Sequence, residues 1–302
     1  MTILSKLRFI ARNAVRPVIG WRKWNRLQFQ VLHGYSPDFM KPSTFLEYIQ
    51  YLKYYGRGGE LGPFVDKVLA KDFARRRIGE EYVIPTIKVI RANDPIDLSD
   101  LPEHWIAKSA HAAGWNYIHK GSGPVSNKVL RKMGRWLERN YFDVSGETNY
   151  RYIPPKILFE PLISEPEEDL KDYKIWCFAG EPKLIGVHGD RAGKPKGEIF
   201  DLNWNRTDWT YPEVPSWPEK PEKPRNLDLL LNLARTLSEG FPFVRVDLYD
   251  GSKGVFFGEL TFTPGDGSNI RIPLSEDIVF GEQVLAAKPD RSVLVSYNME
   301  LF

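Results

Sequence analysis

The sequence has little of what marks secreted, membrane-spanning or nucleic-acid-binding proteins. It holds one cysteine in 302 residues, Cys177, so no disulfide can form within the chain. No apolar run approaches the roughly 18 residues of a membrane span, and charges interrupt the N-terminus where a secretory signal needs a continuous apolar stretch. The net charge of +3 gives no general case for nucleic acid as a partner. We therefore expect a cytoplasmic protein in which Cys177 is a buried thiol.

Acidic residues are missing from residues 1–37, although this segment carries seven lysines and arginines. Apolar residues recur there at helical spacing. They are Leu4, Leu7, Ile10, Ala11, Ala14, Val15 and Val18. Two interpretations stay open. The segment is either a helix packed on the body with a solvated basic face, or a peripheral contact with the inner membrane surface through residues 1–26.

Helical and strand-like patterns are interleaved over the rest of the chain. The first 60 residues are mostly helical in pattern, and further helices are expected in "VDKVLAKDFARRRIG", "SNKVLRKMGRWLERNYF" and "NLDLLLNLARTLSEG". Short β-rich runs lie between them, including "YVIPTIKVI", "HWIAKSAH", "PKILFEPLI" and "DYKIWCFAGEPKLIGVHGD". With 42% hydrophobic residues the chain can bury a substantial core. The pattern predicts an α/β or α+β fold.

Five prolines recur at every third position over residues 212–224, in "PEVPSWPEKPEKP". This spacing matches the three-residue turn of polyproline II, which predicts a stiff surface connection. A ligand for an SH3-type domain is the weaker alternative.

Two carboxylates are predicted to oppose each other in a hairpin over residues 243–263. Alternation puts Arg245, Asp247 and Tyr249 on one face of the first strand, and Phe257, Glu259, Thr261 and Thr263 on one face of the second. If the hairpin is centred on Lys253, then Asp247 lies opposite Glu259, and Arg245 lies opposite Thr261. Opposed Cβ atoms are about 4.5 to 5.5 Å apart, so the two carboxylates repel each other.

Three arrangements can relieve that repulsion: a divalent cation, a shared proton, or an arginine that bridges the pair. A cation suits a nucleotide-phosphate site, because Mg²⁺ prefers one or two carboxylates together with phosphate oxygens. A shared proton suits a retaining glycosidase. A hairpin whose charges are simply solvated is also open.

A glycine-containing loop follows the strand that ends near Lys108. Residues 109–123 include Gly114, Gly121 and Gly123, and glycine lets backbone N–H groups approach phosphate oxygens. The loop lacks the GK[ST] ending of a P-loop. A plain surface loop is equally compatible with this pattern.

Taken in order, these segments resemble the TupA-like branch of the ATP-grasp superfamily, which is linked to cell-surface polysaccharide (teichuronopeptide) biosynthesis. The motifs are "DK", the lysine-glycine loop, "FEPLI", "DYKIWCF", "RVDLY" and "GELTFTP", within residues 41–267. The resemblance implies an α+β ATP-grasp fold whose two lobes clasp ATP, preceded by a helical segment. The expected division is 1–62 for the helical segment, 63–158 for the N-terminal lobe and 159–302 for the C-terminal lobe.

The resemblance also implies how ATP is held. Lys67 and Lys108 resemble the lysines that hold the α- and β-phosphates, and the 109–123 loop, with Gly114, resembles the lid over them. Glu160 resembles the hinge residue beside the adenine, whose edge is read by backbone groups around Leu162 and Ile163.

On the later strands, Asp172 falls where an acidic residue meets the ribose, and Lys174 lies near the phosphates. Arg245 resembles the arginine beside the transferred phosphoryl group, and Asp247 and Glu259 resemble the Mg²⁺ ligands. The family usually has asparagine two residues after this glutamate. Here that position is Thr261, a weaker ligand, which leaves the number of metal ions open.

Substrate contacts are the least specified part of the sequence. Arg191, together with His188 and His111, is a candidate for binding the acyl acceptor or the acyl phosphate, although each histidine alone fits a structural role better. Four tryptophans are candidates for stacking on sugar rings, with packing as the commoner role. They are Trp115, Trp204, Trp209 and Trp217.

The activity implied by the resemblance is ATP-dependent ligation of a carboxylate to an amine through an acyl phosphate, with ATP and Mg²⁺ as cofactors. The substrates would be small molecules or glycans of surface-polysaccharide biosynthesis. One alternative is a glycosyltransferase of the same pathways, although "DLYD" lacks the DxD spacing of many nucleotide-sugar sites. The other is a degenerate ATP-grasp scaffold without catalysis.

Overall fold

The computed structural model describes residues 3–55, 58–163, 169–189 and 194–294. The α-helices are α1 Ile3–His33, α2 Phe45–Tyr55, α3 Gly58–Val65, α4 Lys67–Ile78, α5 Asn127–Leu137, α6 Phe142–Ser145, α7 Leu227–Ser238 and α8 Leu274–Ala286. Three 3₁₀ turns are η1 Glu80–Tyr82, η2 Thr148–Tyr150 and η3 Pro264–Gly267. The strands are β1 Lys88–Arg91, β2 His104–Ser109, β3 Asn116–Lys120, β4 Lys156–Pro161, β5 Lys171–Phe178, β6 Glu181–Gly189, β7 Lys196–Phe200, β8 Phe243–Gly251 and β9 Gly254–Thr261.

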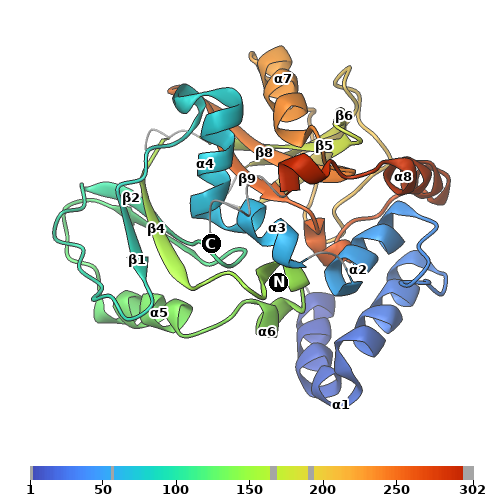
Figure 1. The fold of residues 1–302 in the computed structure, drawn as a ribbon, viewed down its shortest axis with the longest axis horizontal. Coiled ribbons are helices and arrows are strands. Elements are labelled where there is room, and N and C mark those ends of the chain that lie inside the picture. Colours follow the sequence, from blue (N-terminus) through green and yellow to red (C-terminus); the bar gives the residue numbers. More distant parts are fainter. Residues whose placement is uncertain (1–2, 56–57, 164–168, 190–193, 295–302) are drawn as a thin grey trace.

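The strands form two antiparallel sheets. The first has the order β1-β4-β2-β3, and the second has the order β7-β6-β5-β8-β9. Figure 1 shows the first sheet on the left, the second on the right, and α4 between them. This arrangement confirms the predicted α+β class and lets α4 supply side chains to both sheets.

Local signals in the sequence set the ends of α4. Asp66 caps its start, because its carboxylate accepts a hydrogen bond from the Val68 N–H at 3.0 Å. Gly79 ends it with a φ of 102°, a conformation that glycine adopts readily. Both ends agree with the helix predicted for this segment.

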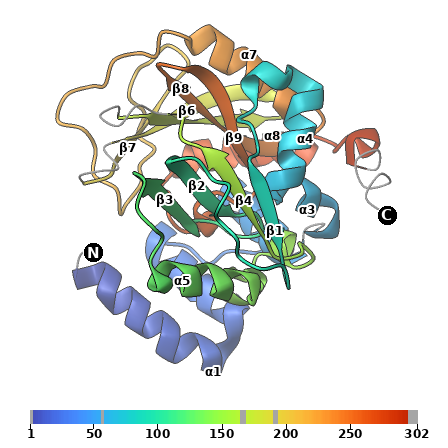
Figure 2. The same cartoon turned by 90° about the vertical axis from the view of Figure 1, so that its left-hand side faces the viewer.

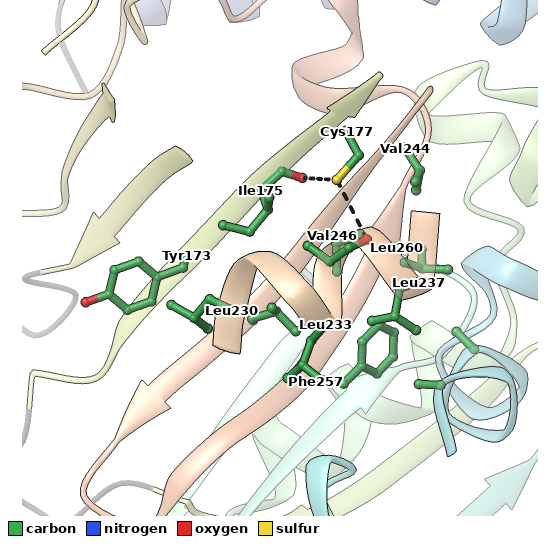
Figure 3. Close-up of a cluster of buried hydrophobic side chains, with 14 of the residues drawn as sticks. Tyr173, Ile175, Cys177, Leu230, Leu233, Leu237, Val244, Val246, Phe257 and Leu260 are labelled. Atoms are coloured by element: carbon green, nitrogen blue, oxygen red, sulfur yellow. Dashed lines mark hydrogen bonds between the residues drawn. The ribbon is translucent and has the colours of Figure 1, made fainter. Parts of the chain in front are cut away.

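The largest core lies on one face of the second sheet, under α4 and α7. Figure 3 shows Leu230, Leu233 and Leu237 of α7 packed over strand side chains such as Ile175 and Val246. Cys177 lies in this core, fully buried, with its Sγ 3.8 Å from the carbonyl oxygens of Ile175 and Ala234. The prediction of a buried thiol is therefore confirmed.

The opposite face of the second sheet carries aromatic side chains at one end and charged side chains at the other. At one end, aromatic side chains such as Trp176 and Phe243 pack against α2 and α8. At the other end, the same alternation along β5 and β8 presents Asp172, Lys174 and Asp247. The charged end faces the space between the sheets, which is where the candidate site forms.

The first sheet has its own core on the side of α5, built from Trp105, Phe159, Met133 and Trp136. Figure 2 shows α5 beneath this sheet, on the same lower side of the molecule as α1. Side chains alternate along a strand. Lys108, which follows the core residue Ala107, and Glu160, which follows Phe159, therefore point to the other face of the sheet, toward α4.

Two expected loop segments differ in outcome. Residues 116–120 of the expected glycine loop form strand β3, paired with β2 in a hairpin, because alternate residues there are half-buried against the sheet. Residues 212–224 form a surface connection without helix or strand, as predicted. Residue 158, the expected end of the N-terminal lobe, lies inside β4, and α4 packs with the second sheet. The division into a helical segment and two lobes at residues 62 and 158 therefore stays a proposal.

Candidate functional site

Glu160 and two lysines form a buried ionic cluster on the first sheet. Lys108 Nζ lies 2.7 Å from Glu160 Oε2, and Lys71 Nζ lies 2.6 Å from Glu160 Oε1. The side chains come from β2, β4 and α4. Sequence reasoning missed Lys71, although its position four residues after Lys67 on one helix predicts that the two share a face.

Burial disfavours the charged form of all three groups, but the ion pairs change the balance. The pKa of Glu160 is held below its ordinary value, because Lys108 and Lys71 outweigh the effect of burial. Glu160 and the Tyr249 hydroxyl raise the pKa of Lys108 despite burial. Burial prevails at Lys71, whose pKa is lowered. The cluster therefore keeps Lys108 positively charged.

The β8–β9 hairpin confirms the predicted cross-strand pairs. Asp247 lies opposite Glu259, and Arg245 lies opposite Thr261. Asp247 is only 2% exposed, which excludes the interpretation of a simply solvated hairpin.

A β-bulge at Gly258 produces this register. The strands pair regularly from Gly251 opposite Gly254 up to Leu248 opposite Phe257, and the register then shifts by one residue. A Cβ at position 258 would lie 3.0 Å from the Asp247 carbonyl oxygen, so the bulge also needs a residue without a side chain. The prediction that the hairpin is centred on Lys253 was therefore wrong. The turn consists of Ser252 and Lys253, and the bulge at Gly258 shifts the register so that Asp247 still lies opposite Glu259.

The bulge also corrects the prediction for Phe257. Alternation placed Phe257 on the face of Glu259, but its side chain is buried in the core on the opposite face, across from Leu248. The extra residue reverses the alternation between positions 257 and 259.

Arg245 relieves the repulsion between the two carboxylates. Its Nε and Nη2 donate to the Asp247 carboxylate at 2.6 and 2.7 Å, and Nη2 lies 3.5 Å from Glu259 Oε1. Lys174 on β5 adds a second cation, with Nζ 2.7 Å from Asp247 Oδ2 and 2.6 Å from Asp172 Oδ2. The structure thus shows the arginine bridge, which is one of the three arrangements considered from the sequence.

These contacts shift the pKa values of the cluster. Burial raises the pKa of Asp247 although Arg245 and Lys174 oppose it. For Glu259, the cations Lys67, Arg245 and Lys174 outweigh burial and lower the pKa. The pKa of Lys174 is raised by Asp172 and Asp247 despite its burial. The carboxylates thus hold these basic groups in their charged form.

Lys67 connects the two sheets and the glycine loop. It is the first residue of α4, and its Nζ donates to the Ala112 carbonyl oxygen at 2.8 Å and lies 3.7 Å from Glu259 Oε2. Lys108 also lies 5.9 Å above the Tyr249 ring of β8. The structure therefore brings Lys67, Lys108 and the hairpin residues into one charged site.

Asp247, Glu259 and Thr261 are the residues predicted from the sequence to bind a metal ion. Among the residues that the structure describes, no group of three or more His, Cys, Asp or Glu could hold a metal ion by itself. The Thr261 hydroxyl donates to Glu259 Oε1 at 3.1 Å and accepts from Arg245 Nη2 at 3.1 Å. Two carboxylates fit Mg²⁺ when substrate phosphates and water supply the other ligands.

The loop and hinge candidates lie around the first sheet. Gly114 lies in the turn between β2 and β3 with a φ of 71°, which favours glycine. The Leu162 N–H donates to the His104 carbonyl oxygen at 3.4 Å, just after β4. Ile163 is the last described residue before the gap at 164–168.

Three residues were predicted to contact the substrate, and the structure describes two of them. Arg191 lies outside the described residues. His111 is buried away from the charged cluster, with its ring nitrogens 3.0 to 3.3 Å from the carbonyl oxygens of Trp136, Arg139 and Lys156, so the structural role is the one observed. His188 lies on β6 opposite Asp172, with its ring 4.5 Å from that of Tyr211.

The tryptophans pack rather than present open faces. Trp204 is stacked on Phe200 at 4.5 Å, and Trp209 Nε1 donates to Glu276 at 2.7 Å, with both indoles buried. Trp115 and Trp217 pack at the edges of cores. The hypothesis of sugar stacking is therefore not supported for Trp204 or Trp209.

Residues 47–285 match the family model described as TupA-like ATP-grasp. No curated protein matches the chain. The chain is 12% identical to D-alanine–D-alanine ligase from Bacillus anthracis complexed with ATP, covering 79% of this chain and 66% of that one, with a TM-score of 0.42. The chain is 14% identical to D-alanine–D-alanine ligase from Helicobacter pylori, covering 75% of this chain and 60% of that one, with a TM-score of 0.44.

The ATP-grasp ligase PsnB, solved with a precursor variant, Mg and ADP, is a further solved structure of this kind. It is 12% identical to the chain over 75% of this chain and 60% of its own, with a TM-score of 0.39. The chain thus spans less than two thirds of the length of these three structures, and the family assignment rests on the family model.

Proposed function

This chain belongs to the TupA-like ATP-grasp family, and from that membership we propose that it is an ATP-dependent carboxylate–amine ligase acting through an acyl phosphate. The predicted ATP-grasp fold is confirmed by the same match, and the family supports ATP-dependent ligation in general terms. The specific reaction and substrates are our proposal.

The observation that supports it best is the charged site between the sheets. Lys67, Lys174 and Arg245 surround Asp247 and Glu259 there. Lys108, paired with Glu160, reaches the same site from the first sheet, 5.9 Å above the Tyr249 ring. Several cations together suit a triphosphate, because its negative charge is spread over several oxygens and must be stabilised during phosphoryl transfer. A surface salt-bridge network would not need to be this buried.

We assign the ATP contacts as follows. Lys67 and Lys108 hold the α- and β-phosphates under the β2–β3 hairpin that contains Gly114, and Lys174 and Asp172 lie toward the ribose and phosphates. Backbone groups at Leu162 and Ile163 meet the adenine edge. Because the Glu160 carboxylate is bound by Lys71 and Lys108, Glu160 acts by orienting Lys108 rather than by touching the base.

Asp247, Glu259 and Thr261 would hold Mg²⁺, which when bound supplies charge neutralisation at the β- and γ-phosphates. Arg245, with Arg191, stabilises the charge on the transferred group. A carboxylate oxygen attacks the γ-phosphorus, the bond to the bridging oxygen breaks, and ADP leaves. An amine nitrogen then attacks the acyl carbon, phosphate leaves, and the amine releases a proton.

The acyl acceptor and donor are small molecules or glycans of cell-surface polysaccharide biosynthesis, and we propose a cytoplasmic site of action.

Hydroxylamine tests the chemistry, because it traps an acyl phosphate as a hydroxamate. We expect hydroxamate and ADP to form together when Mg-ATP and a suitable acid are present. Stabilisation by UDP-sugars with indifference to adenine nucleotides would instead indicate the glycosyltransferase alternative. Binding of Mg-ATP without turnover of any acid would indicate the non-catalytic scaffold.

We also propose that residues 1–26 contact an anionic membrane surface. In the described ranges no helix combines the length and apolarity needed to cross a bilayer. Within this segment Val18 is 84% exposed, and Lys23 and Arg26 are exposed as well. Helix α5, which carries the exposed Arg131 and Arg135, lies on the same lower side of the molecule as α1 in Figures 1 and 2.

Liposome flotation tests this contact. We expect the full chain to float with vesicles that contain phosphatidylglycerol, and not with phosphatidylcholine alone. Equal behaviour with both vesicles would rule out the electrostatic contact.

A further inference from the structure

A cavity of about 190 Å³ lies beside Arg245 and Lys174, the two residues that bind Asp247. Its floor is the second sheet, at Trp176 and His188. One wall is the segment 211–214, and the other is the segment 264–270. The first wall begins at Tyr211, directly before the proline-rich connection of residues 212–224, and continues into that connection. The proposed ATP site does not use this segment.

The sheet is shaped to receive this connection. A Cβ at Gly186 would collide with the Tyr211 hydroxyl, and a Cβ at Gly197 would lie 3.2 Å from side-chain atoms of Tyr211, His188 and Val214. Glycine at both positions therefore lets Tyr211 lie directly on the strands.

Backbone hydrogen bonds fix both walls. The Gly197 N–H donates to the Pro215 carbonyl oxygen at 3.1 Å, which ties the first wall to β7. Thr210 and Arg271 exchange N–H to carbonyl bonds of 3.1 and 2.9 Å, which tie the walls to each other. Pro212 and Pro215 further restrict the backbone. The cavity is thus preformed, as ligand pockets usually are.

The lining indicates which of the two substrates fits. Lys174 and Arg245 supply positive charge for a carboxylate, and their neighbour Asp247 belongs to the proposed phosphoryl-transfer site. Glu213, which also lines the cavity, suits an amino or hydroxyl substituent of the same acid. Tyr211, His188 and Asn269 add polar groups, while Val214 and Ile270 add apolar surface. The volume of about 190 Å³ suits one amino acid or one sugar acid unit.

We propose that this cavity receives the acyl donor, a small carboxylic acid with hydrogen-bonding substituents, and that Tyr211 positions it. The inference rests on the proposed ligase function. It gives the start of the proline-rich connection a role in substrate selection, because Tyr211, directly before it, and Val214, within it, line the cavity wall.

Two variants of the full chain test the cavity. Gly186→Ala displaces Tyr211 from the floor, and Tyr211→Phe removes only the hydroxyl. Gly134→Ala on α5, where an added Cβ meets nothing within 4 Å, is the matched glycine control. Tyr152→Phe, at a side chain that is 68% exposed, is the matched tyrosine control.

The first readout is thermal stability with amino acids in one arm and uronic acids in the other, each with and without Mg-ADP. We expect acids of one arm to stabilise the wild type and both controls. In Gly186→Ala the affinity for the acid should fall at least tenfold, while the response to Mg-ADP stays unchanged. Tyr211→Phe should raise the KM for the acid about tenfold in hydroxamate formation and change kcat little, which a purely structural role would not produce.

The outcomes separate the two proposals. Unchanged acid affinity and KM in both variants would overturn the cavity assignment and leave the ligase proposal standing, as would a wild type that no acid stabilises. If Mg-ADP does not raise the thermal stability of the wild type, that result counts against the ligase proposal. If Gly186→Ala does not fold, Tyr211→Phe decides.

Discussion

Arg245 and Asp247 lie two residues apart on β8 and are joined by two hydrogen bonds, from Nε to Oδ1 at 2.6 Å and from Nη2 to Oδ2 at 2.7 Å. The same carboxylate also accepts from Lys174. One buried anion therefore balances two cations, and in our proposal it also binds metal.

Asp247→Asn should consequently affect both stability and activity. Removing the negative charge leaves Arg245 and Lys174 near each other with less compensation, which should cost about 3 kcal/mol of unfolding free energy. Mg-dependent ADP release should fall by roughly a hundredfold or more, because charge stabilisation in the site is lost. Urea denaturation and ADP release measure the two effects. Asp250→Asn, at the outer end of the same strand, is the control, and wild-type turnover in Asp247→Asn would refute the metal role.

Lys108→Gln should weaken nucleotide binding. A hydrogen bond to a charged group contributes about 1.5 to 3 kcal/mol, so the Kd for Mg-ATP should rise by at least tenfold. Isothermal titration calorimetry gives the Kd directly. Lys183→Gln, at an exposed position near the start of β6, should bind as the wild type does. An unchanged Kd in Lys108→Gln would remove this lysine from the phosphate site.

Glu147 should make stability depend on pH. Burial and the nearby Asp266 raise the pKa of Glu147 from 4.5 to about 7 in the folded protein. The folded state then binds a proton that the unfolded state has lost, so this contribution is complete below pH 4.5 and disappears as pH rises through 7. Asp277, whose pKa burial raises to about 6, acts in the same direction.

The difference between the wild type and Glu147→Gln isolates the contribution of Glu147. The denaturant midpoint of the wild type should fall relative to that of the variant between pH 4.5 and 7. Parallel midpoint curves over this range would contradict the assignment.

Cys177 should react with thiol reagents only after unfolding. Its side chain is fully buried, and burial raises the pKa of the thiol to about 12, so hardly any thiolate forms near neutral pH. Labelling with a chromogenic disulfide reagent should follow the denaturation curve. Full labelling within seconds in native buffer would show that the core over β5 opens readily.

Alternation and end signals predicted the elements whose residues act locally. The end of α4 at Gly79, and the separation of Val246 from Asp247 on β8, follow from neighbouring positions in the sequence. The cap at Asp66 was not predicted. The hairpin pairs were also correct, but for an incomplete reason, because the bulge at Gly258 replaced the assumed symmetric turn.

What the sequence did not reveal depends on contacts between distant segments. Lys71 acquires its role from Glu160, which lies 89 positions later, and the cavity forms where residues 211–214 meet Asn269 over the strands. Strand β3 was expected as loop because glycines flank it, yet pairing with β2 outweighs that local preference. No periodicity within one segment carries such information.

The bulge at Gly258 has a consequence for comparing relatives of this protein. Regular pairing from the turn would set Glu259 opposite Val246, with its carboxylate directed into the apolar core. A one-residue deletion here would therefore turn the proposed metal ligand Glu259 into a buried, unpaired charge. Inserting or deleting one residue on each strand next to the turn would instead keep Asp247 opposite Glu259. In an alignment, a single gap at this position is a change of chemistry rather than a neutral difference in loop length.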